Sequence, residues 1–141
     1  MRSAFAVSLF LASTLCLTNG SAPRHGRAAP AQNAQVIEVT AKKYEYSPSP
    51  IHVKQGAKVQ LKITATDHAH GFKIGEFPDG ADKKGTPGLA FTSPQDCWKI
   101  EKGASATIEF AARTAGTYSF KCCVHCGFGH PGMKGQLVVD P

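Results

Sequence analysis

The chain has 141 residues, of which 42% are hydrophobic, and a formal net charge of +6 at pH 7. A chain of this length builds a single domain around one hydrophobic core. Its cationic residues are scattered, with Lys42-Lys43 and Lys83-Lys84 as the only adjacent basic pairs, which excludes the basic arm typical of nucleic-acid-binding proteins. Such diffuse charge favours either attraction of an acidic protein partner or a simple solvated surface.

The first 22 residues have the layout of an export signal. Arg2 precedes an apolar stretch from Ala4 to Leu17, and small and polar residues follow it. The apolar stretch is too short to span a bilayer comfortably. We therefore expect residues 1–22 to be removed, together with Cys16, and residues 23–34 to form a flexible leader. The mature protein is then expected to be periplasmic or secreted, with no membrane-spanning segment.

Alternation of apolar and polar residues predicts β-strands in the remainder of the chain. It occurs at residues 35–41, 51–54, 59–63, 106–110, 117–122 and 136–139, with turn-forming glycines between several of these stretches. No window has helical periodicity over three turns. The pattern predicts an all-β antiparallel sandwich with Greek-key wiring over residues 35–141.

A long surface loop is expected between the third and fourth of these stretches. The segment from Gly75 to Cys97 contains four glycines and three prolines, with charged residues among them. A compact domain keeps so long a loop for a purpose or tolerates it at the surface.

Potential metal ligands crowd into one stretch near the C-terminus. Cys122, Cys126, His130 and Met133 lie between one predicted strand and the next. Two rigid strand ends fix both ends of such a loop, so little chain entropy is lost when a metal is captured. Thiolate, imidazole and thioether donors together favour copper, or zinc if the methionine is not a ligand.

The stretch from Cys122 to Val139 resembles the binuclear copper loop of cytochrome c oxidase subunit II, which nitrous oxide reductase shares. The resemblance rests on Cys126-Gly-x-Gly-His130 and the trailing Met133-x-Gly-x-Leu-Val-Val. That family takes one more histidine from an upstream turn, and the sequence Thr-Asp-His-Ala-His-Gly-Phe over residues 66–72 places His70 there. Residues 37–46 are similar to the strand that opens the family's soluble domain, so the resemblance covers most of residues 36–139.

The resemblance implies an all-β, cupredoxin-like Greek-key β-sandwich that carries two copper ions in a CuA-type site. The implied ligands are two bridging thiolates, two imidazoles, a thioether and a backbone carbonyl, from Cys122, Cys126, His70, His130, Met133 and Val124 respectively. His70 and Met133 would complete the shell of one ion, and His130 and the Val124 carbonyl that of the other. Such a pair shares one unpaired electron, which implies an electron-transfer protein whose partners are redox proteins such as a cytochrome, an oxidase or a reductase.

The chain also departs from the family pattern. Tyr44 and Tyr46 stand where the family has tryptophans near the electron entry path, and Cys123 and His125 stand where non-ligands are expected. The family's subunit carries two membrane helices ahead of its copper domain, whereas none is expected in the mature form of this chain. This difference favours a soluble relative that passes electrons between periplasmic partners or delivers copper.

Cys97 and Cys123 are two cysteines that the implied centre does not use. If Cys122 faces the core with Tyr118 and Phe120, strand alternation points Cys123 to the opposite face. A disulfide between Cys97 and Cys123, which would join the long loop to the ligand strand, is the resulting hypothesis. Two free thiols or an additional metal ligand fit the sequence as well.

Three other interpretations of the ligand cluster stay open. A zinc knot would leave Met133 as a core residue. A mononuclear cupredoxin would combine His70 and Cys122 with His125 or His130. A copper chaperone or storage protein would use the excess thiols to hold several cuprous ions.

The sequence does not suggest an enzyme in its own right. It lacks a Ser-His-Asp order, paired carboxylates near the ligand cluster, a phosphate-binding loop and a haem attachment motif. Of the remaining histidines, we expect His68 to lie at the surface or against a ligand, and His52 to lie on the surface.

Overall fold

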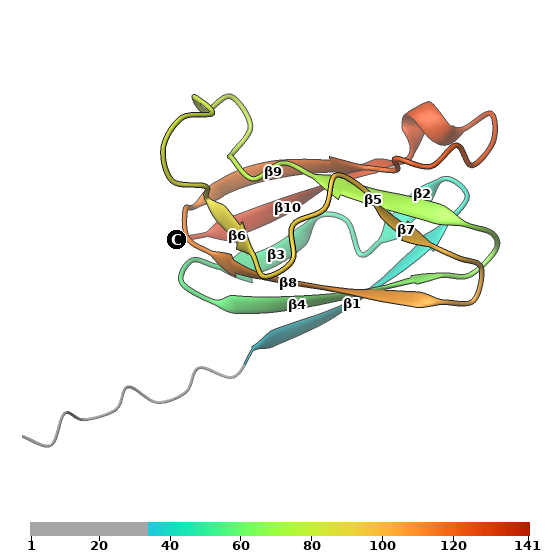
Figure 1. The fold of residues 1–141 in the computed structure, drawn as a ribbon, viewed down its shortest axis with the longest axis horizontal. Coiled ribbons are helices and arrows are strands. Elements are labelled where there is room, and N and C mark those ends of the chain that lie inside the picture. Colours follow the sequence, from blue (N-terminus) through green and yellow to red (C-terminus); the bar gives the residue numbers. More distant parts are fainter. Residues whose placement is uncertain (1–33) are drawn as a thin grey trace, which may run out of the picture. The chain divides into compact units, whose positions relative to one another are not determined.

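The structure, a computed structural model, describes residues 34–141, which form a sandwich of two β-sheets (Figure 1). The expected export signal, and the leader up to residue 33, lie outside the described residues. The elements in chain order are β1 (Gln35–Lys42), β2 (Glu45–Ser47), β3 (Ile51–Lys54), β4 (Lys58–Ala65), β5 (His70–Ile74), β6 (Leu89–Phe91), β7 (Trp98–Ile100), β8 (Ser105–Ala112), β9 (Gly116–Lys121), the 3-10 turn η1 (His130–Gly132) and β10 (Lys134–Asp140).

Each sheet has five strands. The order is β2-β1-β4-β8-β6 in the first sheet and β3-β10-β9-β5-β7 in the second. The all-β sandwich is therefore confirmed, but the expectation that all its strands pair antiparallel is wrong. β1 pairs with β4, and β3 with β10, in parallel. Residue alternation reports which face of a strand is buried and not the direction in which its neighbour runs, so the sequence pattern could not show this.

The core lies between the sheets and is built from the alternating residues of the long strands. On β4 the buried side chains are Val59, Leu61, Ile63 and Ala65, each at most 2% exposed. Burial of one such aliphatic side chain contributes about 1.5–3 kcal/mol. Beneath the loop that follows β9, Tyr46 packs edge-on against Phe72 and Phe120, with ring centroids 5.8 and 5.2 Å apart. This aromatic layer gives the ligand loop a rigid floor.

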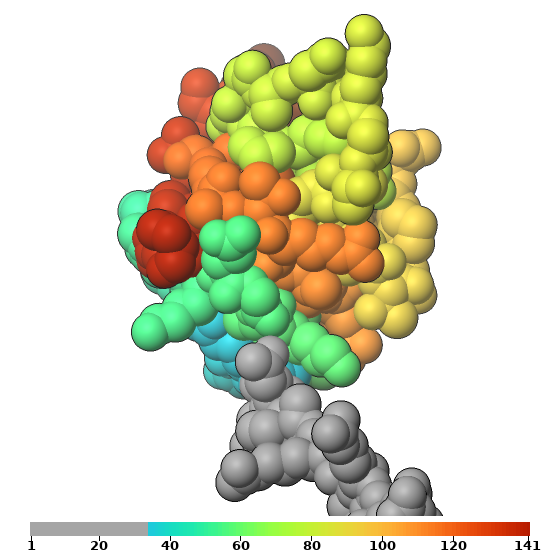
Figure 2. Space-filling view, turned by 90° about the vertical axis from the view of Figure 1, so that its left-hand side faces the viewer, coloured from blue at the N-terminus to red at the C-terminus, as the bar shows by residue number. Residues whose placement is uncertain are grey.

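Four short strands were not predicted: β2, β5, β6 and β7. Three of them have only three residues each, which is too few to establish a period, and β5 does not alternate, because four of its five residues are buried. β6 interrupts the predicted long loop and pairs with β8. Figure 2 shows the end of the sandwich that lies away from the ligand loop. The yellow-green part of the segment from Gly75 to Cys97 projects from the body there. The predicted loop leaves β5 beside Phe120, reaches the far end of β9, where the Asp79 amide donates to the Thr117 carbonyl over 2.8 Å, and returns toward the ligand strand at Cys97.

The hypothesis of a Cys97–Cys123 disulfide is confirmed. The two sulfur atoms are bonded and the Cα atoms are 5.9 Å apart. Cys122 is buried on the core side of the sheet, and Cys123 is half-buried on the other side. The backbone of Gly71 lies against this bridge, since a Cβ atom there would stand 2.6 Å from the Cys123 Sγ and 2.8 Å from the Val124 nitrogen. Only glycine lets β5 approach the ligand strand this closely.

Replacing both bridged cysteines, Cys97→Ser with Cys123→Ser, should lower the free energy of unfolding of the metal-free protein by about 3 kcal/mol, because a bridge over a sequence separation of 26 residues restricts the unfolded chain. Urea unfolding measures the change. A reductant should destabilise the parent protein by a similar amount and leave the double variant unaffected. Equal sensitivity of both proteins to the reductant would contradict the prediction.

Candidate metal centre

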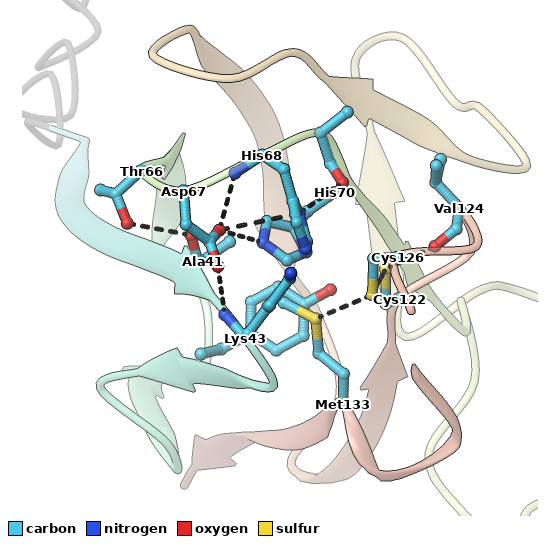
Figure 3. A network of polar contacts seen from close by, with 12 residues as sticks. Ala41, Lys43, Thr66, Asp67, His68, His70, Cys122, Val124, Cys126 and Met133 are labelled. Atoms are coloured by element: carbon cyan, nitrogen blue, oxygen red, sulfur yellow. Dashed lines mark hydrogen bonds and ion pairs between the residues drawn. The ribbon is translucent and has the colours of Figure 1, made fainter. Parts of the chain in front are cut away.

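The candidate ligands gather at the end of the sandwich where β9 leads into the loop that returns as β10 (Figures 1 and 3). A hydrogen bond from the Cys122 amide to the Met133 carbonyl, 2.9 Å long, closes the base of this loop. The amide of Gly71 on β5 donates to the Cys122 Sγ over 3.3 Å. Cys122, Cys126 and Met133 are at most 7% exposed. The donors therefore lie in a dry, closed space between three strands.

The two free thiols stand side by side without being bonded to each other. The Sγ atoms of Cys122 and Cys126 are 3.7 Å apart. The Cys126 Sγ also lies 3.7 Å from the Met133 Sδ and 3.5 Å from the Nδ1 atom of His130. The Cys122 Sγ lies 3.1 Å from the carbonyl oxygen of Val124.

His70 brings an imidazole from β5 to these sulfurs. One of its ring nitrogens and the Sγ atoms of Cys122 and Cys126 all lie within 4.8 Å of one another. The structure thus places all six sequence-predicted site residues at one point: His70, Cys122, Val124, Cys126, His130 and Met133. Neither of the other two histidines near the cluster belongs to this group of donor atoms.

The orientation of the His70 ring is fixed by Asp67 (Figure 3). The Nε2–H group of His70 donates to the Asp67 Oδ1 over 2.6 Å, because an ionised carboxylate can only accept. The Nδ1 atom therefore carries a lone pair, and this fully buried atom has no hydrogen-bond partner among residues 34–141. A buried lone pair without a partner costs free energy. Together with two thiols, a thioether and a second imidazole, it fits a borderline or soft metal such as copper.

Asp67 remains ionised because three donors converge on it. Burial alone would raise its pKa, but hydrogen bonds from the His70 ring and from the backbone amides of Lys43 and His68 outweigh burial and hold the pKa well below its usual range. The sequence contained Asp67 only as part of the family motif. Its position three residues before the histidine was the available sign that a carboxylate orients the ring.

The two tyrosines at the family's tryptophan positions have different roles. Tyr46 is buried, and its hydroxyl donates to the Gly71 carbonyl. Its pKa is raised by burial and then by the neighbouring thiols of Cys122 and Cys126. Tyr44 packs under the loop, where a Cβ atom on Gly127, whose φ is +118°, would lie 2.7 Å from the tyrosine hydroxyl. The two glycines of the Gly-x-Gly motif thus let the loop settle on Tyr44, and Phe128 between them is left fully exposed.

The two additional histidines near the cluster have different surroundings. The ring of His68 is half-buried and packs on that of His70, with centroids 4.3 Å apart, in agreement with its expected place against a ligand. His125 is exposed, and its ring lies 5.7 Å from that of His130. His52 is exposed on β3, as expected, and contacts Asp140 over 3.1 Å.

The geometry agrees with what comparison to known proteins reveals. The cupredoxin-like domain family matches residues 6–139. The chain belongs to this family. The cupredoxin-like chain is 32% identical over 107 residues to subunit 2 of the cytochrome c oxidase of Thermus thermophilus. The aligned region covers 76% of this chain and 67% of that relative, and 54% of a second Thermus thermophilus sequence of the same subunit.

Solved structures share the fold. The periplasmic domain of oxidase subunit II from Bradyrhizobium japonicum has a TM-score of 0.54 at 15% identity, with 75% of this chain and 83% of that one covered. Auracyanin A, a "blue" copper protein from Chloroflexus aurantiacus, has a TM-score of 0.52 at 20% identity, with coverages of 77% and 100%. This cupredoxin-like chain therefore has the fold of copper electron-transfer proteins and is related to oxidase subunit 2. Within residues 34–141, no helix is long and apolar enough to cross a membrane.

Asp67→Ala should weaken metal binding by about 10- to 100-fold. Without the carboxylate, neither the orientation of the His70 ring nor the nitrogen that carries its proton is fixed. Competition with a chelator of known affinity measures the effect. The exposed carboxylate of Glu38, which pairs with Lys62 over 3.3 Å, supplies the control Glu38→Ala, with unchanged affinity expected. Equal effects of the two substitutions would contradict the assignment.

The metal-free protein should lose stability in alkaline solution. Burial, followed by the neighbouring Cys122, raises the pKa of the Cys126 thiol from 9.0 to about 11. Below pH 9 the thiol is protonated in both states. Between pH 9 and about 11 only the unfolded chain releases the proton, so the free energy of unfolding falls, by about 2–3 kcal/mol at most. Anaerobic urea unfolding on either side of this window measures the fall, which should be smaller in Cys126→Ser. An identical pH profile for that variant would refute the prediction.

Proposed function

We propose that this protein is an exported electron carrier with a binuclear CuA-type copper site. One observation carries the proposal: two unbonded cysteine sulfurs 3.7 Å apart, within 4.8 Å of a histidine nitrogen. Two thiolates that face the same space can each bridge two metal ions, whereas the mononuclear cupredoxin alternative uses Cys122 alone. The relation to oxidase subunit 2 supports the same reading.

The proposed ligands divide into two sets that share the cysteine sulfurs. His70 and Met133 belong to one ion. His130 and the Val124 carbonyl belong to the other. Both donors lie beside the shared sulfurs, with the His130 Nδ1 atom 3.5 Å from the Cys126 Sγ and the Val124 oxygen 3.1 Å from the Cys122 Sγ. Copper bound there supplies a one-electron couple shared by two ions.

The protein's own contribution is to hold the donors still. The Met133 carbonyl and the Gly71 amide fix Cys122, while Asp67 fixes His70. Two further features restrict the loop. The aromatic layer of Tyr46, Phe72 and Phe120 packs on its core side, and the Cys97–Cys123 disulfide holds it on the outer side. Donors that do not move between oxidation states keep the energetic cost of each electron transfer low, which is what a carrier requires.

The proposed setting follows from the relatives and from the export signal. The periplasmic location of the Bradyrhizobium japonicum domain supports a periplasmic or secreted protein. The proposed partners are redox proteins such as a cytochrome or an oxidase or reductase complex, with this chain as an electron donor, acceptor or subunit and not the site of catalysis. The burial of His70, Cys122, Cys126 and Met133, which leaves little room for a substrate beside the metal, supports a carrier instead of a catalyst.

Copper reconstitution followed by metal counting and electron spin resonance tests the proposal. We expect two coppers per chain and one spin spread over two nuclei. Cys126→Ser should abolish this spectrum, because one bridging sulfur is lost. Met133→Leu, of similar volume, should keep both coppers and mainly shift the reduction potential, since a weak thioether tunes a site more than it holds it.

A single copper per chain, or an unchanged spectrum in Cys126→Ser, would refute the binuclear site and favour the mononuclear alternative. Several spectroscopically silent cuprous ions would favour copper storage or delivery.

A further inference from the structure

The proposed copper site is closed to a hydrated ion. His70 and Met133 are fully buried, and Cys122 and Cys126 are 3% and 7% exposed. A metal ion must therefore meet a donor at the surface before it reaches the sulfurs. His130 is the half-buried member of the ligand set that offers a side-chain donor both to the interior and to solvent.

The ring of His130 lies between the buried sulfur atoms and the surface. Its Nδ1 atom lies 3.5 Å from the Cys126 Sγ, so its Nε2 atom, at the other edge of the ring, points away from that sulfur. The exposed ring of His125 stands beside it, with centroids 5.7 Å apart and planes inclined by 48°. A copper or zinc ion between two imidazoles sits about 2.0–2.1 Å from each nitrogen. Two rings at this separation can provide that span.

From this geometry we propose that His125 and His130 form a surface capture site for cuprous ion, through which copper enters the closed centre. The proposal rests on the proposed copper function and adds a route by which the site is filled. It also accounts for a histidine that stands in the ligand loop outside the ligand set.

The transfer is a ligand exchange without a redox step. Cuprous ion leaves the imidazole of His125 while His130 retains its position beside Cys126. Each thiol that takes up the ion releases one proton to solvent. Copper enters and remains in the cuprous state, so no oxidant is required.

The rate of copper uptake tests the route. The metal-free protein is mixed with the coloured cuprous complex of bathocuproine disulfonate, and the loss of colour is followed in stopped flow. His125→Ala should slow uptake by about tenfold or more and leave the final copper content unchanged, because no ligand of the centre has been removed. The matched control is His52→Ala, since His52 is also exposed but lies on β3. It should load at the parent rate.

A second measurement looks at the capture site alone. In the variant Cys122→Ser with Cys126→Ser, silver ion, a redox-inert substitute for cuprous ion, should shift the ring resonances of His125 and His130. Adding His125→Ala should remove these shifts.

The outcomes separate the two proposals. Equal uptake rates for the parent and His125→Ala would overturn the capture route, as would equal slowing by His52→Ala. Absence of copper in the loaded parent would overturn the proposed function, whereas silver shifts at His125 and His130 would still support the capture site. If the double serine variant does not fold, the uptake rates decide alone, because His125 is a surface residue whose removal leaves the core intact.

Discussion

Two neighbouring cysteines at the end of β9 point to opposite sides of the second sheet, and the metal end of the molecule depends on this separation. Strand alternation sends Cys122 into the core beside Cys126, where both sulfurs stay unbonded, and sends Cys123 outward to Cys97. The inner pair provides soft donors in a dry space. The outer pair fastens the same backbone from the solvent side. Gly71 makes this arrangement possible, because the β5 backbone passes close to the sulfur atoms of both Cys122 and Cys123, where a larger side chain would not fit.

The second constraint comes from Asp67, which accepts the Nε2–H of His70 and leaves Nδ1 as the unprotonated nitrogen. A buried imidazole with an unspecified tautomer would present a proton to the site for part of the time. The carboxylate removes that ambiguity, and the backbone amides of Lys43 and His68 keep it charged and in place. The candidate metal centre thus depends on Asp67, which lies in the turn between β4 and β5 and holds His70 in place. Binding strength at such a site depends on this outer layer as much as on the donors.

Much of this arrangement could be predicted from residue order, and the failures have physical causes. The long alternating strands, such as β4 with Val59, Leu61 and Ile63, identified the sandwich, and the spacing of Cys126, His130 and Met133 identified the family. The two parallel pairings, β1 with β4 and β3 with β10, were not predicted, because alternation carries no information on the direction of a neighbouring strand. The short strand β7 was not predicted because three residues do not establish a period, and β5 was not predicted because buried residues on both of its faces hide the alternation. The sequence left three possibilities for Cys97 and Cys123, namely a disulfide, two free thiols or an additional metal ligand. The structure was needed to choose the disulfide, because it shows the two sulfur atoms bonded. The number of bound ions stays a prediction.

The Cys97–Cys123 bridge also has a consequence for how the protein matures. Among the four cysteines of the folded domain, only one single disulfide leaves both inner thiols free. In the folded chain the sheet itself keeps the two sets apart, but an unfolded chain under oxidising conditions has no such barrier, and a wrong pairing would consume a thiol of the candidate metal centre. Correct oxidation therefore requires that β9 be in place before the thiols react, or that a reductant or isomerase reopen the wrong bonds. Assembly of the sheet, and not the redox conditions alone, then decides whether a molecule can ever hold its metal.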